Sequence, residues 1–439
     1  MPRTITQKDA FRFFAPLVFM TELNMISKSV IHAFLARLAA PKLVLAAFSI
    51  SFTFYYTLTS ATEVSSLLAL SFLRERRSLR RLLGFFCLLL ALPMAVVQVV
   101  AWTPLGAAFY GGLFGAGPEV VAQAQWATFL FSLSAPILML RALAFALIML
   151  NRHNVLITLS TLLRLFSLGI SLLVYPLWLS GAAVGAAALV TCMAVETAFA
   201  WSVARRYYLA LPESGAPLPS YGALWGFSWP LALNQATEIG IAFGINIFLG
   251  RLTRPELALA AFGVVHGLAG VMFSPMRNLV HTAQTLVRTR RDAREMARFT
   301  GWLVAGFSAL VAAVVFSPLR VWVLEGVMGL TPELTAYSEP AIMLTLLIAA
   351  FWGYSALFRG LLAAARRTRV AALSGLARIA MVVLAGTVTL FHPGLNGAVF
   401  GIAVWALSLG VEAVILGWRV RAGRPGDSLF PDEPETKQP

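Results

Sequence analysis

The stretch FSWPLALNQATEIGIAFGINIFLGR, residues 227–251, decides the fold class and also raises the main question about function. Its length and its apolar ends are typical of a helix that crosses a hydrocarbon core about 30 Å thick. Five polar residues nevertheless lie inside it: Asn234, Gln235, Thr237, Glu238 and Asn246. Polar groups at that depth are costly unless they face protein, water or a ligand, so the carboxylate of Glu238 requires an explanation.

The composition of the whole chain is that of a membrane protein. Of its 439 residues, 59% are hydrophobic and only 12% are charged, and the mean hydropathy is +0.80. Soluble domains carry about twice that share of charged residues. The net charge of +15 could indicate nucleic-acid binding, but the charges stand in short runs between apolar blocks. We therefore expect the lipid bilayer as a partner and no nucleic acid.

The apolar blocks predict an all-α, polytopic membrane protein with twelve membrane-spanning helices. The predicted spans run at 11–36, 43–71, 82–103, 124–150, 155–178, 182–207, 223–250, 256–286, 297–324, 336–364, 369–391 and 395–420. Cys87 and Cys192 both lie inside such blocks, so neither a disulfide framework nor a metal site is indicated.

The charge of the loops predicts the topology. Alternate loops differ, because one set is rich in arginine and the other holds few basic residues. The arginine-rich runs begin at Arg74, Arg152, Arg205, Arg288, Arg366 and Arg419. By the positive-inside rule we expect both termini in the cytoplasm and the protein in an inner or plasma membrane. Residues 425–439 are polar and proline-rich, which predicts a disordered cytoplasmic tail.

The two halves of the chain repeat each other. Residues of the same type recur at a shift of 214 positions, and of 216 positions near the end: Pro16 and Pro230, Arg37 and Arg251, Arg164 and Arg378, Glu196 and Glu412. Six spans per half is an even number, so both halves have the same orientation about an axis along the membrane normal. We expect lobes at 1–210 and 223–424, a linker at 211–222, and a substrate path near the midplane between the lobes.

Charged residues lie inside the predicted spans. The arginines among them are Arg141, Arg164, Arg277, Arg359 and Arg378. Each costs about 2.5–3.5 kcal/mol on insertion scales, so the five would cost on the order of 10–15 kcal/mol if they faced lipid. They must therefore face protein, water or a ligand. Glu63 and Arg277, at equivalent positions of the repeat, each lie roughly 16 Å from an arginine run at 1.5 Å per residue.

These charges favour a basic, water-filled cavity for an anionic substrate. The predicted substrate-binding residues are Arg277, Arg141, His281, Asn234, Gln235 and Lys28. The predicted counter-charges, or sites that couple transport to H⁺ or Na⁺, are Glu63, Glu238 and Glu22. A structural interpretation competes with this one. It expects ion pairs among Arg164, Arg378, Glu196 and Glu412, an Arg359 that extends to the membrane surface, and a secondary role for Asn246.

The predicted helix 256–286 carries a polar stripe. Successive spacings of 11, 4, 3 and 4 residues place five side chains on one face of a continuous helix: His266, Arg277, His281, Gln284 and Arg288. Such a face is expected of a helix that lines a cavity, where His281 could titrate near neutral pH. The first predicted helix has a comparable face made of Asn24, Lys28 and His32.

The sequence contains no enzymatic motif. No lysine follows a glycine, which excludes the phosphate-binding loop of ATPases. No cluster of histidine, cysteine and carboxylate residues has metal-ligand spacing. We therefore expect neither catalysis nor a cofactor beyond a coupling ion.

The opening stretch resembles a known family of membrane transporters. Its matching residues are similar to the pattern of helix seven in the progressive ankylosis (ANK) family: Phe227, Trp229–Leu233, Ala236, Thr237, Asn246, Phe248 and Arg251. Shorter similarities occur at 376–379, at Gly397 and Ala398, and around Glu412. This family lies in the multidrug/oligosaccharidyl-lipid/polysaccharide (MOP) flippase superfamily, as do the multidrug and toxin extrusion (MATE) transporters. The resemblance implies a MATE-like fold and the export of small anions such as citrate, pyrophosphate or nucleotides.

The chain departs from the ANK pattern within the same stretch. The family carries arginines where Ile239 and Ala242 stand, and Glu238 replaces a neutral amide. The first departure argues against transferring the exact substrate, and the second could signal a different coupling ion.

We therefore predict a monomeric secondary transporter that exports anions by alternating access. Three alternatives stay open. A MATE-type antiporter for cations or drugs would bind its substrate, H⁺ or Na⁺ at Glu22, Glu63 and Glu238. A flippase for lipid-linked precursors would use a similar cationic path for a much larger anion. A membrane enzyme is supported only by scattered polar residues.

Overall fold

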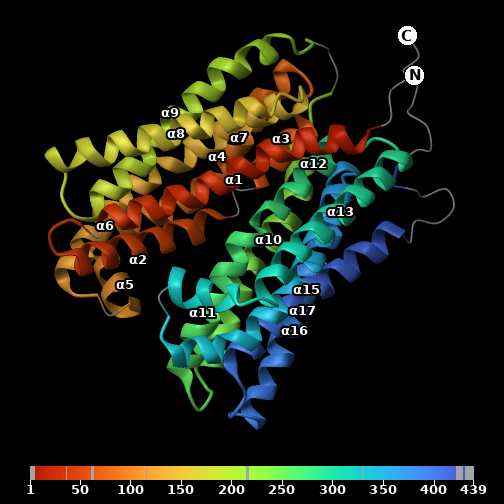
Figure 1. Ribbon diagram of the computed structural model, residues 1–439. Helices are drawn as coiled ribbons and strands as arrows, with labels where there is room; N and C mark the ends of the chain where they lie inside the picture. The colour runs from red at the N-terminus through yellow and green to blue at the C-terminus, as the bar shows by residue number, and fades with distance from the viewer. Residues whose placement is uncertain are drawn as a thin grey trace. The chain divides into compact units, whose positions relative to one another are not determined.

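The protein is all-helical throughout the part of the chain that the structure describes (Figure 1). The computed structural model describes residues 5–35, 37–60, 64–114, 116–213, 217–328, 330–421 and 429–430. The all-α prediction is confirmed. Within these ranges nine helical stretches are long and apolar enough to cross a membrane. The predicted tail 425–439 lies outside the described residues except for 429–430.

The chain forms two compact units, which we call the N-terminal unit (Ala15–Ser228) and the C-terminal unit (Met1–Phe14 and Trp229–Pro439). Their boundaries fall inside helices α1 (Gln7–Leu35) and α10 (Tyr221–Leu249). The two boundaries are equivalent at the repeat shift of 214 residues. Each repeat therefore contributes the first two turns of its first helix to the other unit.

Specific contacts explain this exchange of helix ends. The backbone N–H of Ile5 donates to Asp292 at 3.1 Å, and the rings of Phe14 and Phe299 lie 5.6 Å apart, which ties the start of α1 to the C-terminal unit. In the N-terminal unit, the start of α10 is held by the guanidinium of Arg81, 3.8 Å from the ring centre of Tyr221.

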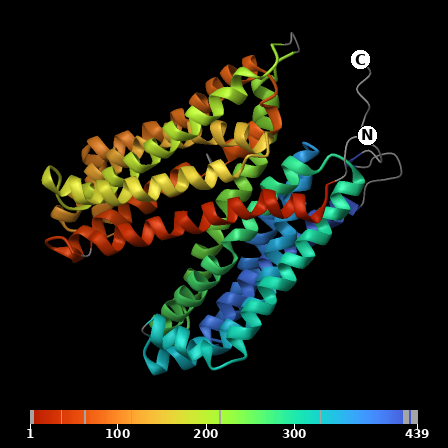
Figure 2. The same ribbon diagram turned by 45° about the horizontal axis from the view of Figure 1, so that its top comes forward.

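The N-terminal unit is a bundle in which α9 is central. Its further helices are α2 (Pro41–Thr59), α3 (Ser65–Phe72), α4 (Arg76–Trp102), α5 (Pro104–Phe114), α6 (Pro118–Ser132), α7 (Ser134–Leu150), α8 (Val155–Val174) and α9 (Ala182–Leu209). Helices α7 and α8 both pack on α9, as Figures 1 and 2 show. The alanine-rich α9 permits close packing, since a Cβ on Gly185 would lie only 2.8 Å from the ring of Phe48.

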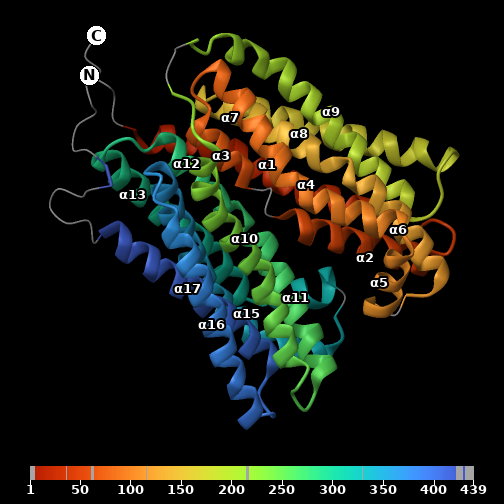
Figure 3. The same cartoon turned by 180° about the vertical axis from the view of Figure 1, so that it is seen from behind.

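The C-terminal unit has α15 at its centre. Its further helices are α11 (Pro255–Phe273), α12 (Asn278–Leu286), α13 (Arg290–Val315), α14 (Leu319–Val321), α15 (Pro332–Ala364), α16 (Arg369–Phe391) and α17 (Gly397–Arg421). Helix α15 packs on α11, α12, α13 and α17, and α16 packs on α17 (Figure 3).

In each unit, one predicted span holds two α-helices, at equivalent positions of the repeat. In the C-terminal unit the 3₁₀ turn Ser274–Arg277 separates α11 from α12, and Pro275 within it has no N–H to donate. In the N-terminal unit α2 ends at Thr59 and α3 begins at Ser65, although residues 61–63 lie outside the described ranges. The predicted span 256–286 is thus present as one helical stretch, Leu257–Leu286, but a 3₁₀ turn inside it changes the helical period.

Several helices begin earlier than the hydrophobic blocks predict. Helix α4 starts at Arg76 instead of residue 82, and α13 starts at Arg290 instead of residue 297. Side chains that cap the first turns explain the difference, since Thr289 and Asp292 form reciprocal hydrogen bonds at the start of α13. A helix can thus continue through charged residues beyond the hydrocarbon core.

The packing of α15 on α12 provides a test of the fold. A Cβ on Gly360 would lie 2.6 Å from the carbonyl oxygen of Val280 and 2.8 Å from Ala283, whereas a Cβ on Gly267 would meet nothing within 4 Å. We expect Gly360→Ala to destabilise the protein by about 1–3 kcal/mol, because two helix backbones must separate. Gly267→Ala should be neutral or slightly stabilising. Thermal unfolding in detergent measures both, and equal midpoints would contradict the close approach.

Candidate functional site

The N-terminal unit holds a buried ionic cluster on three helices. Glu196 on α9 is fully buried, and its Oε2 accepts from Nη1 of Arg141 on α7 at 2.7 Å. Nη1 of Arg164 on α8 lies 3.5 Å from the same oxygen. Thr161 donates to Oε1 of Glu196 at 2.8 Å. Arg164 also donates to the side-chain oxygen of Asn24 on α1 at 2.5 Å. We call Arg141, Arg164 and Glu196 the N-terminal triad.

The C-terminal unit repeats this cluster. Glu412 on α17 is fully buried and lies 3.0 Å from both Arg359 on α15 and Arg378 on α16. Asn234 on α10 donates to Oε1 of Glu412 at 2.9 Å. Arg378 donates in addition to Glu238 on α10 at 2.6 Å. We call Arg359, Arg378 and Glu412 the C-terminal triad.

The two triads contain the ion pairs that the structural interpretation expected. Arg164 pairs with Glu196, and Arg378 pairs with Glu412. Arg359 differs from the sequence expectation, because its guanidinium reaches Glu412 and does not extend to the membrane surface. The repeat does not indicate this pair, because the two arginines, Arg141 and Arg359, are not at equivalent positions. Arg359 stands one helical turn beyond Ser355, the position equivalent to Arg141, and its long side chain spans the difference.

The clusters differ in the residues that complete them. Asn24 and Glu238 occupy equivalent positions at the shift of 214, and each accepts from the arginine of its own unit across 140 residues of sequence. Two arginines of the N-terminal cluster thus meet one carboxylate, whereas two arginines of the C-terminal cluster meet two. This answers the question raised by the opening stretch, because Glu238 neutralises Arg378 inside the C-terminal unit.

Each buried glutamate also accepts a hydrogen bond from a neutral side chain, but the donor differs between the two units. Thr161 donates to Glu196, but the equivalent position in the other repeat is Gly375, which has no donor. There Asn234 donates to Glu412 instead. The absence of a side chain brings α16 close to α10, since a Cβ on Gly375 would lie 3.0 Å from Thr237.

Arg277 is the one interior arginine without a carboxylate partner within 4.0 Å among the described residues. It is the last residue of the 3₁₀ turn between α11 and α12, and its side chain is exposed. Its guanidinium carbon lies 5.3 Å from the ring centre of Trp352 on α15. The charge of Arg277 also interacts electrostatically with Glu238 and His266.

The polar stripe predicted on 256–286 is divided by this turn. His266 on α11 packs 4.3 Å from the ring of Trp405, while His281 lies on α12 and its buried Nδ1 has no hydrogen-bond partner among the described residues. Gln284 is buried on α12, and Arg288 lies beyond the end of that helix. Of these five side chains, Arg277 and His266 interact electrostatically with Glu238.

The structure describes some of the other predicted site residues and not others. Gln235 on α10 and Glu22 on α1 are half-buried, and Asn246 on α10 is exposed. Glu63 and the side chain of Lys28 lie outside the described residues. Their predicted roles stay predictions.

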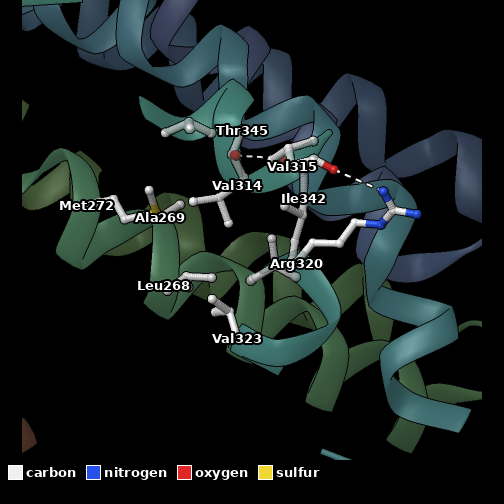
Figure 4. Close-up of a pocket in the computed structure, with 11 residues that line it drawn as sticks. Leu268, Ala269, Met272, Val314, Val315, Arg320, Val323, Ile342 and Thr345 are labelled. Atoms are coloured by element: carbon white, nitrogen blue, oxygen red, sulfur yellow. Dashed lines mark hydrogen bonds between the residues drawn. The ribbon is translucent and has the colours of Figure 1, made fainter. Parts of the chain in front are cut away.

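A small pocket in the C-terminal unit is a poor candidate for substrate binding (Figure 4). Its cavity volume is about 20 Å³, which accommodates about one water molecule. The walls are apolar and include Leu268, Met272, Val314 and Ile342. Arg320 donates to the carbonyl of Val315 at 3.2 Å and pairs with Glu339, so its charge is already compensated.

The buried carboxylates should dominate the stability of each unit. We expect Glu196→Gln and Glu412→Gln each to cost about 3–5 kcal/mol, because each leaves two guanidinium groups without their shared counter-charge. Glu333→Gln is the matched control. Its side chain is 72% exposed and lies 3.5 Å from Arg254, so its loss should change stability by less than about 1 kcal/mol. Unfolding in detergent measures all three, and equal effects would contradict the structural role of the triads.

Solved structures with the same fold exist, although no family model and no curated protein matches the sequence. A mutant of the Vibrio cholerae MATE transporter VcmN has a TM-score of 0.76 and 16% identity, over 95% of this chain and 98% of that chain. The eukaryotic MATE transporter AtDTX14 has a TM-score of 0.70 and 15% identity, over 94% and 95%. A MOP superfamily transporter from Pyrococcus furiosus, whose binding pocket has a reverse polarity that suggests a different function, has a TM-score of 0.69 and 16% identity, over 94% and 95%. The predicted twelve membrane helices in two six-helix repeats are thus confirmed, and the chain has the fold of the MATE transporters of the MOP superfamily.

Proposed function

We propose that this protein is a secondary active transporter that exports small organic or phosphate-type anions by alternating access. The fold it shares with MATE transporters supports the transporter class. The single observation that carries the choice of an anion is Arg277, an exposed guanidinium inside a membrane span that has no carboxylate partner among the described residues.

The charge balance around Arg277 favours a bound anion. Three arginines (Arg277, Arg359 and Arg378) and two carboxylates (Glu238 and Glu412) meet in this part of the C-terminal unit. Because both carboxylates already pair with Arg359 or Arg378, the remaining positive charge resides on Arg277. A cation inside a bilayer costs several kcal/mol unless it is neutralised or hydrated, and an anionic substrate neutralises it.

The interruption between α11 and α12 makes this charge available. Arg277 ends the turn Ser274–Arg277, where backbone groups leave the regular helical pattern. Discontinuous membrane helices recur at the substrate sites of secondary transporters, because their ends expose polar backbone groups at the midplane. The face of Trp352 beside the guanidinium restricts its orientation.

Helices α1 and α10 are the elements through which the conformational change would act. Each passes from one compact unit to the other, and each has a proline two residues beyond that point, Pro16 and Pro230. A proline inside a helix removes one backbone hydrogen bond and weakens the helix locally. Equivalent weak points in two equivalent helices suit a symmetric change between two states.

The resemblance to the ANK family guides the choice of substrates to test. It favours citrate, pyrophosphate and nucleotides, and we propose further that the protein acts as a monomer in an inner or plasma membrane with cytoplasmic termini. The MATE-type cation or drug antiporter is the second candidate function. It is favoured by the fold and by the interior carboxylate Glu238, while a lipid-linked precursor flippase is the third.

Substitution of Arg277 tests the proposed anion transport directly. We expect Arg277→Ala to lower the uptake of labelled citrate or pyrophosphate into proteoliposomes by at least about tenfold, since a hydrogen bond to a charged group contributes about 1.5–3 kcal/mol. Arg254→Ala is the control, because Arg254 is 67% exposed and lies outside the spans. If only an organic cation is transported, and Arg277→Ala leaves that flux intact, the anion proposal is wrong.

Substitution of Glu238 distinguishes the first two candidate functions. For an anion transporter, Glu238→Gln should lower the KM for pyrophosphate by about two- to fivefold, because a screened repulsion of about 0.5–1 kcal/mol is removed. Exchange of labelled substrate without a gradient is the appropriate assay, since it does not depend on a gradient of a coupling ion. A cation antiporter would instead lose its cation flux in Glu238→Gln.

A further inference from the structure

An open groove runs along the C-terminal unit between α15 and α17, apart from the triads and from Arg277. Its cavity volume is about 730 Å³. Three aromatic residues of α15 form one wall, and two glycines and an arginine of α17 form the other: Phe351, Tyr354, Phe358, Gly410, Gly417 and Arg421. Figure 3 shows that the two helices run side by side.

The spacing of small and aromatic residues produces the groove. A Cβ on Gly410 would lie 3.4 Å from the ring of Phe351, and a Cβ on Gly417 would lie 2.7 Å from the ring of Phe358. Both contacts repeat after seven residues, so α15 and α17 run in the same direction. The rings therefore lie directly against the backbone of α17, and Ala413 between the glycines leaves the space above them open.

The length of the groove matches one leaflet of a bilayer. Eleven residues separate Gly410 from Arg421, which corresponds to about 16 Å along a helix, or half of a hydrocarbon core about 30 Å thick. Arg421 is the last residue of α17 and lies at the end of the span. Val414 and Trp418, at the rim, are 71% and 69% exposed, so the groove opens to the surface of the unit.

We propose that this groove binds an acyl chain of an anionic phospholipid, with the phosphate of the same lipid held by Arg421. The aromatic wall provides a flat apolar surface for the chain, and the guanidinium at the groove's end provides charge complementarity for the headgroup. A soluble anion would leave the aromatic wall uncovered, and a neutral lipid would not use the charge of Arg421, which has no carboxylate partner within 4.0 Å among the described residues. The site is independent of the proposed transport path.

Native mass spectrometry of the full-length protein released from nanodiscs tests the proposal. The nanodiscs contain phosphatidylcholine with phosphatidylglycerol as the minor component, and the readout is phosphatidylglycerol bound per protein. We expect Arg421→Gln to lower its apparent affinity by at least about tenfold, because a charge-assisted hydrogen bond between guanidinium and phosphate is lost. Ala413→Leu fills the groove without removing charge and should lower occupancy by a similar factor. Arg419→Gln is the matched control, because Arg419 lies on the same last turn but does not line the groove.

Three outcomes would overturn the proposal. Equal losses in Arg419→Gln and Arg421→Gln would show that only the general surface charge attracts the lipid. Unchanged lipid binding in Ala413→Leu, with unchanged thermal unfolding, would show that the groove is not the site. A protein dimer that Ala413→Leu dissociates would make the groove an interface between two copies of the chain.

Discussion

The neutralisation of buried guanidinium groups is the constraint on which each unit depends. An arginine that leaves water must find a counter-charge and hydrogen-bond acceptors. Without them, the free energy lost on desolvation exceeds the free energy gained from packing. Glu196 and Glu412 meet this need, because each fully buried carboxylate lies within 3.5 Å of arginines on two other helices. Glu196 thereby connects α7, α8 and α9, and Glu412 connects α15, α16 and α17, the equivalent helices of the other repeat.

The repeats have kept this arrangement and diverged around it. Asn24 and Glu238 stand at equivalent positions and both accept from the arginine of their own unit, but only Glu238 carries a charge. The described C-terminal cluster of Arg359, Arg378, Glu238 and Glu412 is therefore neutral without Arg277, and the proposed anion site rests on that additional guanidinium. The two repeats therefore differ in the charge of their buried clusters through a single residue difference at equivalent positions.

The interior ion pairs could be predicted from the sequence only in part. The constant register of the repeat pointed to Arg164 with Glu196 and Arg378 with Glu412, because a duplicated pair of opposite charges suggests a contact in both copies. The same register hid the role of Arg359, which lies one helical turn away from the position equivalent to Arg141. It also suggested a continuous polar face on 256–286, because a helical period assumes unbroken hydrogen bonding, and the turn Ser274–Arg277 breaks it.

The sequence by itself determined the all-α class, the number of spans and the duplication. These properties follow from the length of the apolar blocks and from a constant shift between the halves, both of which are read along the chain. Only the tertiary structure decided which carboxylate neutralises which arginine, which helix ends exchange between the units, and which guanidinium stays exposed. Arg164 with Asn24 and Arg378 with Glu238 each join residues 140 positions apart, and such contacts exist only after the helices pack at a particular depth and rotation.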